Sequence, residues 1–362
     1  MSGITSVTDR RTEPHLAVYP SLTDLPAAAL GLFADPATDL FASHVWFATL
    51  VAHALPEGWT PHLVLCRIDG MPAALLPLAR TARRGSTLQS LTGFYSLTFR
   101  PLLAPGVSPA IAGSVIGQVC RRAGPVRLDA LAPDAPGLDA FVAGLRHVGL
   151  AVLRFDHFGN WYEPVAGLSF GDYLAARPGP LRSTIRRKMR RAEAVATFSV
   201  ITGEPQLTEG IASYEAIYAR SWKEPEPFPA FHPALIRAVA ENSLLRLGVL
   251  RLSGQPAAVQ LWIVSGSRAI LLKLAHDEAF AALSPGTVLT ALMIEWLLGE
   301  EDLTELDFGC GDDPYKRLWT THRRQRIGLL LVNPLRPRGL AEIGRSLLGT
   351  GWRRLSAARR PV

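Results

Sequence analysis

Only three cysteines, Cys66, Cys120 and Cys310, occur in this chain of 362 residues, and they lie far apart in the sequence. Three separated cysteines form neither a disulfide framework nor a cysteine metal site, so a reducing, cytoplasmic environment is expected. No apolar run is long enough to span a bilayer, and the polar start MSGITSVTDRRTEPH contains no hydrophobic signal segment. These absences argue against a disulfide-stabilised secreted domain and against an integral membrane protein.

Sequence motifs of metal and nucleotide chemistry are also missing. No His-Glu-x-x-His run, no Gly-Lys-Ser/Thr phosphate loop and no G-x-S-x-G elbow occurs, and the nine histidines are scattered. The segment GCGDD contains one G-x-G, but it lacks the third glycine and the following helix of a dinucleotide site. We therefore expect neither a metal centre nor a dinucleotide cofactor.

The chain is rich in apolar residues and in arginine. Apolar residues make up 48% of the sequence and charged residues 19%, which predicts a sizeable core divided between two domains of ordinary size. The net charge of +7 comes mostly from arginine, concentrated in LRSTIRRKMRR (residues 181–191) and in the tail beyond Leu335. Either cluster can face phosphate groups, RNA or a lipid surface, or can simply be the solvated face of a helix.

Two segments of the chain read alike. RIDGMPAALLPL begins at Arg67 and RLSGQPAAVQLW at Arg251, and each has small turn residues between apolar runs, which predicts a β-hairpin. Downstream of each hairpin, a Ser-Pro pair opens a helical pattern, with serine at the N-cap and proline at the first helical position. A short strand with a Leu-Asp pair follows, at Asp129 and Asp307. The same order of elements in both places predicts a duplicated αβ unit.

The two units are separated near residues 159–167. We expect a first unit at 1–164, a second at 165–335 and a basic tail at 336–362. In the tail, apolar residues from Leu340 to Leu355 recur close to helical spacing between arginines. Such a helix can lie on the anionic inner face of a membrane, or it can dock on its own domain.

The second copy carries chemistry that the first copy lacks. Gly286 stands where the first copy has Ala110, and a glycine at an uncovered helix N-terminus leaves room for an anion such as a pyrophosphate. The alternative is a helix whose glycine only packs against a neighbour. The strand after this helix continues as FGCGDDPYKRLW (residues 308–319), with Tyr315 as a proton donor and Lys316 as an anion-binding group.

Two further groups of polar residues accompany these motifs. Asp312 and Asp313 can orient an amine or bind a cation, or can be solvated loop residues. Lys273 lies inside the otherwise apolar strand RAILLKLAHDE, so it either reaches an edge of the sheet or points into a polar site.

The order of hairpin, strand, glycine-bearing helix and strand resembles the GNAT acyltransferase fold. Its duplication resembles the FemAB-like tandem GNAT proteins and, more closely, the cellulose-biosynthesis (CelD/BcsL)-type acetyltransferases. The resemblance covers the chain up to about Leu335, and the segments that carry it are LRSTIRRKMRR, YARSWK (218–223), KLAHDEAFAALSPGT (273–287) and LDFGCGDDPYKRLW (306–319). It implies an α/β (α+β) protein of two tandem GNAT-like domains, each a mixed, mostly antiparallel twisted sheet flanked by helices.

The resemblance also implies a mechanism and a set of site residues. Acyl-CoA would place its pyrophosphate on the helix N-terminus and its pantetheine arm between two splayed strands, about 269–276 and 304–308. A strand N–H would polarise the thioester carbonyl, and the acceptor amine would attack directly. The cofactor-binding residues would be Leu274, Ala275, Ser284, Pro285, Gly286, Thr287, Val288 and Leu289. Tyr315 would be the acid, Asp307 or Asp277 the base, and Trp222, Lys223, Lys273, His276, Asp312 and Lys316 would shape the acceptor pocket.

Departures from the family pattern keep other donors open. Leu283 occupies the usual arginine or glutamine position of the phosphate loop, and Val288 replaces its second glycine. FemAB-type enzymes take aminoacyl-tRNA, and the basic helix at 181–191 suits RNA, but residues 207–242 leave no room for their long helical arm. The sequence therefore favours acyl-CoA over tRNA, with a small-molecule, peptide or amino-sugar amine as acceptor. A non-catalytic GNAT-like scaffold of an envelope or exopolysaccharide system is the third alternative, and the oligomeric state is left open.

Overall fold

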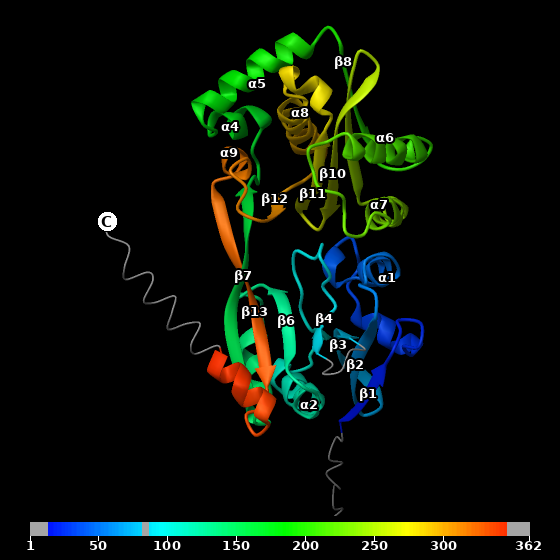
Figure 1. The fold of residues 1–362 in the computed structure, drawn as a ribbon, viewed down its shortest axis with the longest axis vertical. Helices are drawn as coiled ribbons and strands as arrows, with labels where there is room; N and C mark the ends of the chain where they lie inside the picture. Colours follow the sequence, from blue (N-terminus) through cyan, green and yellow to red (C-terminus); the bar gives the residue numbers. More distant parts are fainter. Residues whose placement is uncertain (1–13, 82–86, 346–362) are drawn as a thin grey trace, which may run out of the picture.

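The protein is an elongated two-lobed molecule built on one continuous twisted sheet (Figure 1). The computed structural model describes residues 14–81 and 87–345. Over these residues the sheet has 13 strands in the order β1-β2-β3-β4-β6-β13-β7-β12-β11-β10-β9-β8, with β5 paired to β3. Within the described strands, only the pairs β4–β6 and β11–β12 are parallel. The predicted mixed, mostly antiparallel sheet flanked by helices is confirmed.

The first half of the chain contributes the lower lobe in Figure 1. Its elements are β1 (His15–Tyr19), η1 (Ala27–Leu32), η2 (Leu40–Ala42), α1 (His44–His53), β2 (Trp59–Ile68), β3 (Met71–Thr81), β4 (Leu88–Ser90), β5 (Leu102–Leu103), α2 (Pro109–Arg122), β6 (Val126–Leu131), α3 (Leu138–His147) and β7 (Ala151–Pro164). Pro109 occupies the first helical position of α2, as predicted from the Ser-Pro pair.

The second half contributes the upper lobe and then returns to the lower one. Its elements are α4 (Phe170–Ala175), α5 (Gly179–Ala192), β8 (Ala196–Ile201), α6 (Leu207–Ala219), α7 (Phe231–Glu241), β9 (Leu245–Leu252), β10 (Gln255–Ser265), β11 (Arg268–His276), η3 (Glu278–Leu283), α8 (Pro285–Glu300), β12 (Glu305–Cys310), α9 (Lys316–Trp319) and β13 (His322–Val332). The apolar side of α5 is buried at Leu181, Ile185 and Ala192, and α5 packs on α8 and η3.

The two halves repeat the same series of elements. Hairpins β2–β3 and β9–β10 turn at Asp69-Gly70 and Ser253-Gly254, and all four residues have positive φ angles of 52°, 78°, 49° and 78°. Positive φ at both turn positions matches the right-handed twist of the flanking strands, so the predicted hairpin turns are confirmed. Helices α2 and α8 then lead into β6 and β12 in the same order.

The halves complete each other's sheet by exchanging strands. Strand β13, from the end of the chain, lies between β6 and β7 of the first half, and β7 lies between β12 and β13. β13 pairs with β7 from His322 to Val332, so the two long strands run side by side through the waist (Figure 1). The boundary proposed near Pro164 coincides with the end of β7, while the sheet continues across it.

Aromatic packing at the waist fixes the two halves against each other. The ring of Tyr95, from the first half, stacks on Phe231 of α7 with centroids 4.3 Å apart, and Trp46 of α1 meets Phe231 edge-on at 5.7 Å. Trp46 Nε1 donates to Ser96 Oγ at 3.1 Å. Segment 91–97 is therefore held between α1 and α7 and presented to the second half.

Strands β11 and β12 separate partway along their length. Their parallel register joins Arg268–Ile270 only to Glu305–Asp307, although β11 continues to His276 and β12 to Cys310. The separated ends face the start of α8, which follows β11 through η3. The splay inferred from the family resemblance is therefore present.

The tail leaves the lower lobe after β13. Residues 337–345 are helical, and the remainder of the predicted amphipathic helix, up to Leu355, lies outside the described residues. Among the residues that the structure describes, no helix has the length and apolar character needed to cross a membrane.

Candidate active site

A cavity of about 710 Å³ opens where β11 and β12 separate. Its walls come from β11, from the turn after β12, from the start of α8, from the segment after α6 and from Phe94 of the first half. It is lined by Phe94, Trp222, Lys223, Leu271, Leu272, Lys273, Leu274, His276, Ala281, Ser284, Gly286, Thr287, Phe308, Cys310, Asp313, Tyr315 and Lys316. Residues of the second unit that are far apart in sequence, from Trp222 to Lys316, thus line one cavity.

The start of α8 is open to this cavity. Ser284 has left-handed backbone angles (φ 51°, ψ 54°), and its side chain makes no capping hydrogen bond, unlike the predicted serine cap. The N–H groups of Thr287 and Val288 both donate to the Ser284 carbonyl oxygen, at 3.0 and 3.1 Å. Pro285 has no N–H, so the N–H of Gly286 remains to face the cavity, where an anion can accept from it.

The corresponding start of α2 in the first half has other surroundings: Ser108 is exposed, and the turn at Gly137 contacts Pro109. A Cβ placed on Gly137 would lie 2.7 Å from Cγ of Pro109, so the turn before α3 packs directly on the first residue of α2. The two copies differ in that the start of α8 lines the cavity beside the separated strands, whereas no residue from the start of α2 lines it.

His276 and Trp222 form the wall beside this helix start. A Cβ on Gly286 would lie 3.2 Å from His276 Nδ1, which is buried and has no hydrogen-bond partner. Burial lowers the pKa of His276, so the imidazole is neutral at pH 7. The Trp222 ring lies 4.3 Å from the imidazole and is 50% exposed, which makes it part of the cavity rim.

Tyr315 is held toward α8 by a chain of hydrogen bonds. Its hydroxyl lies 2.6 Å from Thr290 Oγ1, and Thr290 donates to the Gly286 carbonyl oxygen at 2.9 Å. Because the single hydroxyl proton of Thr290 is used there, Tyr315 is the donor in its bond to Thr290. Burial raises the pKa of Tyr315 well above its ordinary value, so the phenol keeps its proton at neutral pH.

Lys273 does not reach an edge of the sheet but forms a buried ion pair. Its ammonium lies 2.5 Å from Glu226 Oε1, and the Glu226 side chain is 7% exposed. Tyr95 donates to Glu226 Oε2 at 2.7 Å, and Tyr218 donates to Oε1. Burial alone would raise the pKa of Glu226, but the hydrogen bonds from Lys273, Tyr218 and Tyr95 outweigh it and lower the pKa to about 2. Glu226 therefore remains a carboxylate and joins both halves of the molecule.

The three predicted aspartates lie outside the cavity lining. Asp307 is buried, and its oxygens accept from Asn160 Nδ2 at 2.6 Å, from the Gly309 N–H at 2.7 Å and from Arg324 at 2.6 Å. These bonds shape the irregular end of β12, where Gly309 has a φ of 72°. Asp277 caps η3 through the N–H of Ala279 at 3.0 Å and pairs with Arg220 at 2.7 Å.

Asp312 and Asp313 point to different sides of their turn. The hydrogen bonds from Arg323 and Trp161 lower the pKa of Asp312 to about 2 and hold it on the outer surface. Asp313 lines the cavity, and its Oδ1 accepts the N–H of Tyr315 at 2.8 Å. One of the pair therefore reaches the cavity and the other does not.

Ten of the predicted site residues line the cavity together. They are Trp222, Lys223, Lys273, Leu274, His276, Ser284, Gly286, Thr287, Tyr315 and Lys316. The other predicted cofactor-binding residues, Ala275, Pro285, Val288 and Leu289, are buried in the packing of β11 and α8 against the sheet.

Sequence reasoning missed the walls that come from distant segments. A smaller compartment of about 90 Å³ adjoins the cavity and is lined in part by Phe94, Tyr95, Phe231 and His232. Burial, with Lys273 nearby, lowers the pKa of His232 to about 3. Phe94 and Tyr95 belong to the first half, and no spacing pattern links them to the second. The one local feature that could have pointed to this site is the carboxylate of Glu226, which lies in a proline-rich stretch between two helices.

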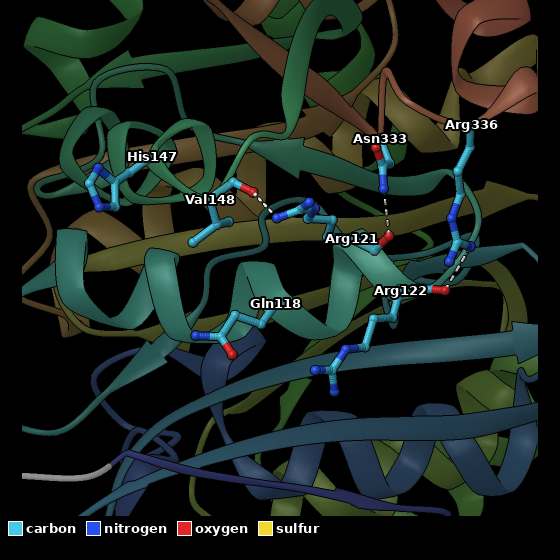
Figure 2. A pocket seen from close by; sticks show the side chains of 7 residues that line it. All are labelled: Gln118, Arg121, Arg122, His147, Val148, Asn333 and Arg336. Carbon is cyan, nitrogen blue, oxygen red and sulfur yellow. Dashed lines mark hydrogen bonds between the residues drawn. The ribbon is translucent and has the colours of Figure 1, made fainter.

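A second cavity, of about 590 Å³, lies in the lower lobe and is shown in Figure 2. Two of its arginines donate to main-chain oxygens: Arg121 to the Val148 carbonyl oxygen at 3.3 Å, and Arg336 to that of Arg122 at 2.8 Å (Figure 2). Arginines bonded to the last carbonyl groups of a helix are C-terminal caps. Among the described residues, no group of three or more histidine, cysteine, aspartate and glutamate side chains is arranged to hold a metal ion.

Comparison with known proteins agrees with this geometry. Residues 180–317 match the family model for the acetyltransferase (GNAT) domain, and no curated protein sequence matched the chain. The solved structure of FemX is similar with a TM-score of 0.60 and 13% identity, covering 84% of this chain and 95% of that one. A conserved protein of unknown function from Bacteroides thetaiotaomicron VPI-5482 is similar with a TM-score of 0.54 and 8% identity, covering 88% and 100%.

At such identities the structural likeness establishes the fold, and the family match establishes the type of domain that contains the cavity. Residues 180–317 therefore match a GNAT acetyltransferase domain, and the chain as a whole has a FemX-like fold.

Proposed function

We propose that this protein is an N-acyltransferase that moves an acetyl or longer acyl group from acyl-CoA to an amine. The observation that carries the proposal is the single cavity that joins the open start of α8 to the Tyr315 hydroxyl. A helix start with an unused N–H attracts phosphate, and the separated strands β11 and β12 leave main-chain groups available for the pantetheine arm.

The reaction proposed here is a direct attack in a ternary complex. The neutral amine forms a C–N bond with the thioester carbonyl, the C–S bond breaks, and the thiolate of CoA takes a proton from the Tyr315 hydroxyl. The proton lost by the amine goes to cavity water or to the neutral imidazole of His276. Asp307 and Asp277, whose oxygens are held outside the cavity, act as positioning residues in this scheme.

Titration with acyl-CoA tests this proposal. We expect calorimetry to show binding of acetyl-CoA or a longer acyl-CoA, and Gly286→Glu to weaken it at least about 100-fold, because a carboxylate would meet the phosphates. Gly299→Glu is the matched control, since Gly299 lies in the same helix with nothing within 4 Å of its added Cβ. Equal affinities for the two variants, or no binding by the unaltered protein, would contradict the proposal.

One observation favours aminoacyl-tRNA as a second candidate donor. Within residues 14–81 and 87–345, Arg186, Arg187, Arg190 and Arg191 on α5 are exposed and form no ion pair. Lys188 Nζ donates to the Ala282 carbonyl oxygen at 2.5 Å, which places α5 beside the start of α8. Salt-sensitive binding of charged tRNA that is lost in Arg186→Ala/Arg187→Ala, without acyl-CoA binding, would favour this donor.

A further inference from the structure

Lysine is scarce in this chain, and its distribution is uneven. Of the 38 basic residues, only four are lysines: Lys188, Lys223, Lys273 and Lys316. Three of the four line the candidate active site. Arginine supplies nearly every other positive charge, including the helix caps of the lower lobe. A small, strongly hydrated ammonium is thus concentrated in the one cavity where chemistry is proposed.

The three cavity lysines differ in their partners. Lys273 is neutralised by Glu226, whereas Lys223 and Lys316 have no carboxylate oxygen within 4.0 Å in the described part of the chain. Lys316 donates to the Cys310 carbonyl oxygen, and Lys223 lies 5.7 Å from the centre of the Trp222 ring. Asp313 shares the cavity, but one of its oxygens already accepts the Tyr315 N–H.

These two ammonium groups are also withdrawn from water. Burial lowers the pKa of Lys223, with the positive charge of Lys273 adding to the effect, and burial lowers the pKa of Lys316. A partly buried ammonium without a contacting carboxylate is unfavourable for the folded protein, and such groups are typical of sites that bind a charged ligand.

Lys316 also faces a compartment away from the start of α8, where the phosphates of acyl-CoA would bind. Lys316 also lines the smaller compartment together with Phe308 and Gly309, whereas no residue from the start of α8 lines that compartment. The pyrophosphate of acyl-CoA belongs to the start of α8 in the proposed function. An anion at Lys316 would therefore come from the other substrate.

We propose that the acceptor is an amine that carries its own carboxylate or phosphate group, bound by Lys316 and Lys223. This inference rests on the proposed acyl transfer and names its acceptor class. A simple cationic amine would be repelled by the two ammonium groups, whereas an amine with an internal anion would bind. The same positive field favours the uncharged form of the attacking amino group, which is the nucleophile.

The scarcity of lysine makes a direct test practical. Protein labelled with ¹³C at lysine Cε has four side-chain signals, which single Lys→Arg variants assign. With acetyl-CoA present, we would add glycine and glycinamide, then 2-aminoethyl phosphate and ethanolamine, as pairs that differ in the anion. We expect the Lys316 and Lys223 signals to move with one anionic member of a pair and not with its neutral counterpart. The pair that shifts the signals shows whether the bound anion is a carboxylate or a phosphate. The Lys188 signal is the internal control and should not move.

Kinetics supply the second measurement. The ratio of kcat/KM for the anionic over the neutral amine, followed by CoA release, should be on the order of tenfold or more and should fall toward one in Lys316→Met. Lys188→Met should keep the ratio. The inference is overturned if neutral and anionic amines react equally, or if the two signals move with CoA alone. Absence of both CoA binding and CoA release would instead overturn the proposed function.

Discussion

At the scale of single residues, the proposed role of Tyr315 as the acid can be tested most directly. Its hydroxyl lies 2.6 Å from Thr290 Oγ1 and lines the cavity. In the proposed reaction it gives its proton to the departing thiolate. Tyr315→Phe keeps the ring and removes only the hydroxyl, so we expect kcat to fall on the order of 100-fold with little change in acyl-CoA affinity. Steady-state kinetics and calorimetry measure the two effects separately.

The pH profile provides the control for this prediction. Because burial raises the pKa of Tyr315, the acid form persists to high pH, and its ionisation should not reduce kcat of the unaltered enzyme between pH 7 and about pH 10. A descending limb in that range that disappears in Tyr315→Phe would contradict the assignment of Tyr315 as a persistently protonated acid.

Sequence patterns could bring residues together where one continuous segment contains them. Gly286, Lys273 and Lys316 lie on or next to elements whose spacing is local, so their convergence followed from the order of the elements. Phe94 and Glu226 were missed because their contacts join distant segments: Tyr95 and Glu226 are 131 residues apart in sequence. Such contacts depend on tertiary packing that no local pattern encodes.

At the scale of elements, the segment between α6 and α7 connects the strand β11 to the first half. Its carboxylate, Glu226, accepts from Lys273 of β11 and from Tyr95 of segment 91–97. Glu226→Gln leaves the Lys273 ammonium without its counter-charge, so we expect a loss of about 3 kcal/mol in the free energy of unfolding at pH 7. Urea denaturation measures it. Glu224→Gln, on the same segment and exposed, should have little effect.

The sign of the pH dependence follows from the direction of the shift. The pKa of Glu226 is about 2 in the folded protein and 4.5 ordinarily, so the carboxylate stabilises the fold fully above about pH 4.5. That contribution is lost as the pH falls from 4.5 toward 2. The stability difference between Glu226→Gln and the unaltered protein should therefore shrink over this range. A difference that stays constant from pH 7 to pH 3 would show that Glu226 does not act as a charge.

At the scale of the whole molecule, the exchange of β7 and β13 makes the two halves dependent on each other. Without β13, a fragment of residues 1–164 would expose unpaired edges of β6 and β7. We expect this fragment alone to aggregate or to lack a cooperative thermal transition, and to be recovered as a complex when co-expressed with residues 165–362. Size-exclusion chromatography and thermal melting decide this, and a stable, monomeric 1–164 fragment would contradict it.

The sequence by itself determined the repeated order of hairpin, helix and strand, and it predicted which residues of the second repeat would lie together. Turn residues at positive φ, Ser-Pro helix starts and Leu-Asp strands act over a few neighbouring residues, so their consequences could be read directly. Only the tertiary structure decided that the two units share one sheet and that Asp307 and Asp277 are held outside the cavity. It also decided that Phe94 lines the cavity and that Tyr95 and Glu226 hold Lys273 in place beside it. The pairing of β7 with β13 and the hydrogen bond between Tyr95 and Glu226 join residues more than a hundred positions apart, and local sequence patterns carry no information about which of those contacts form.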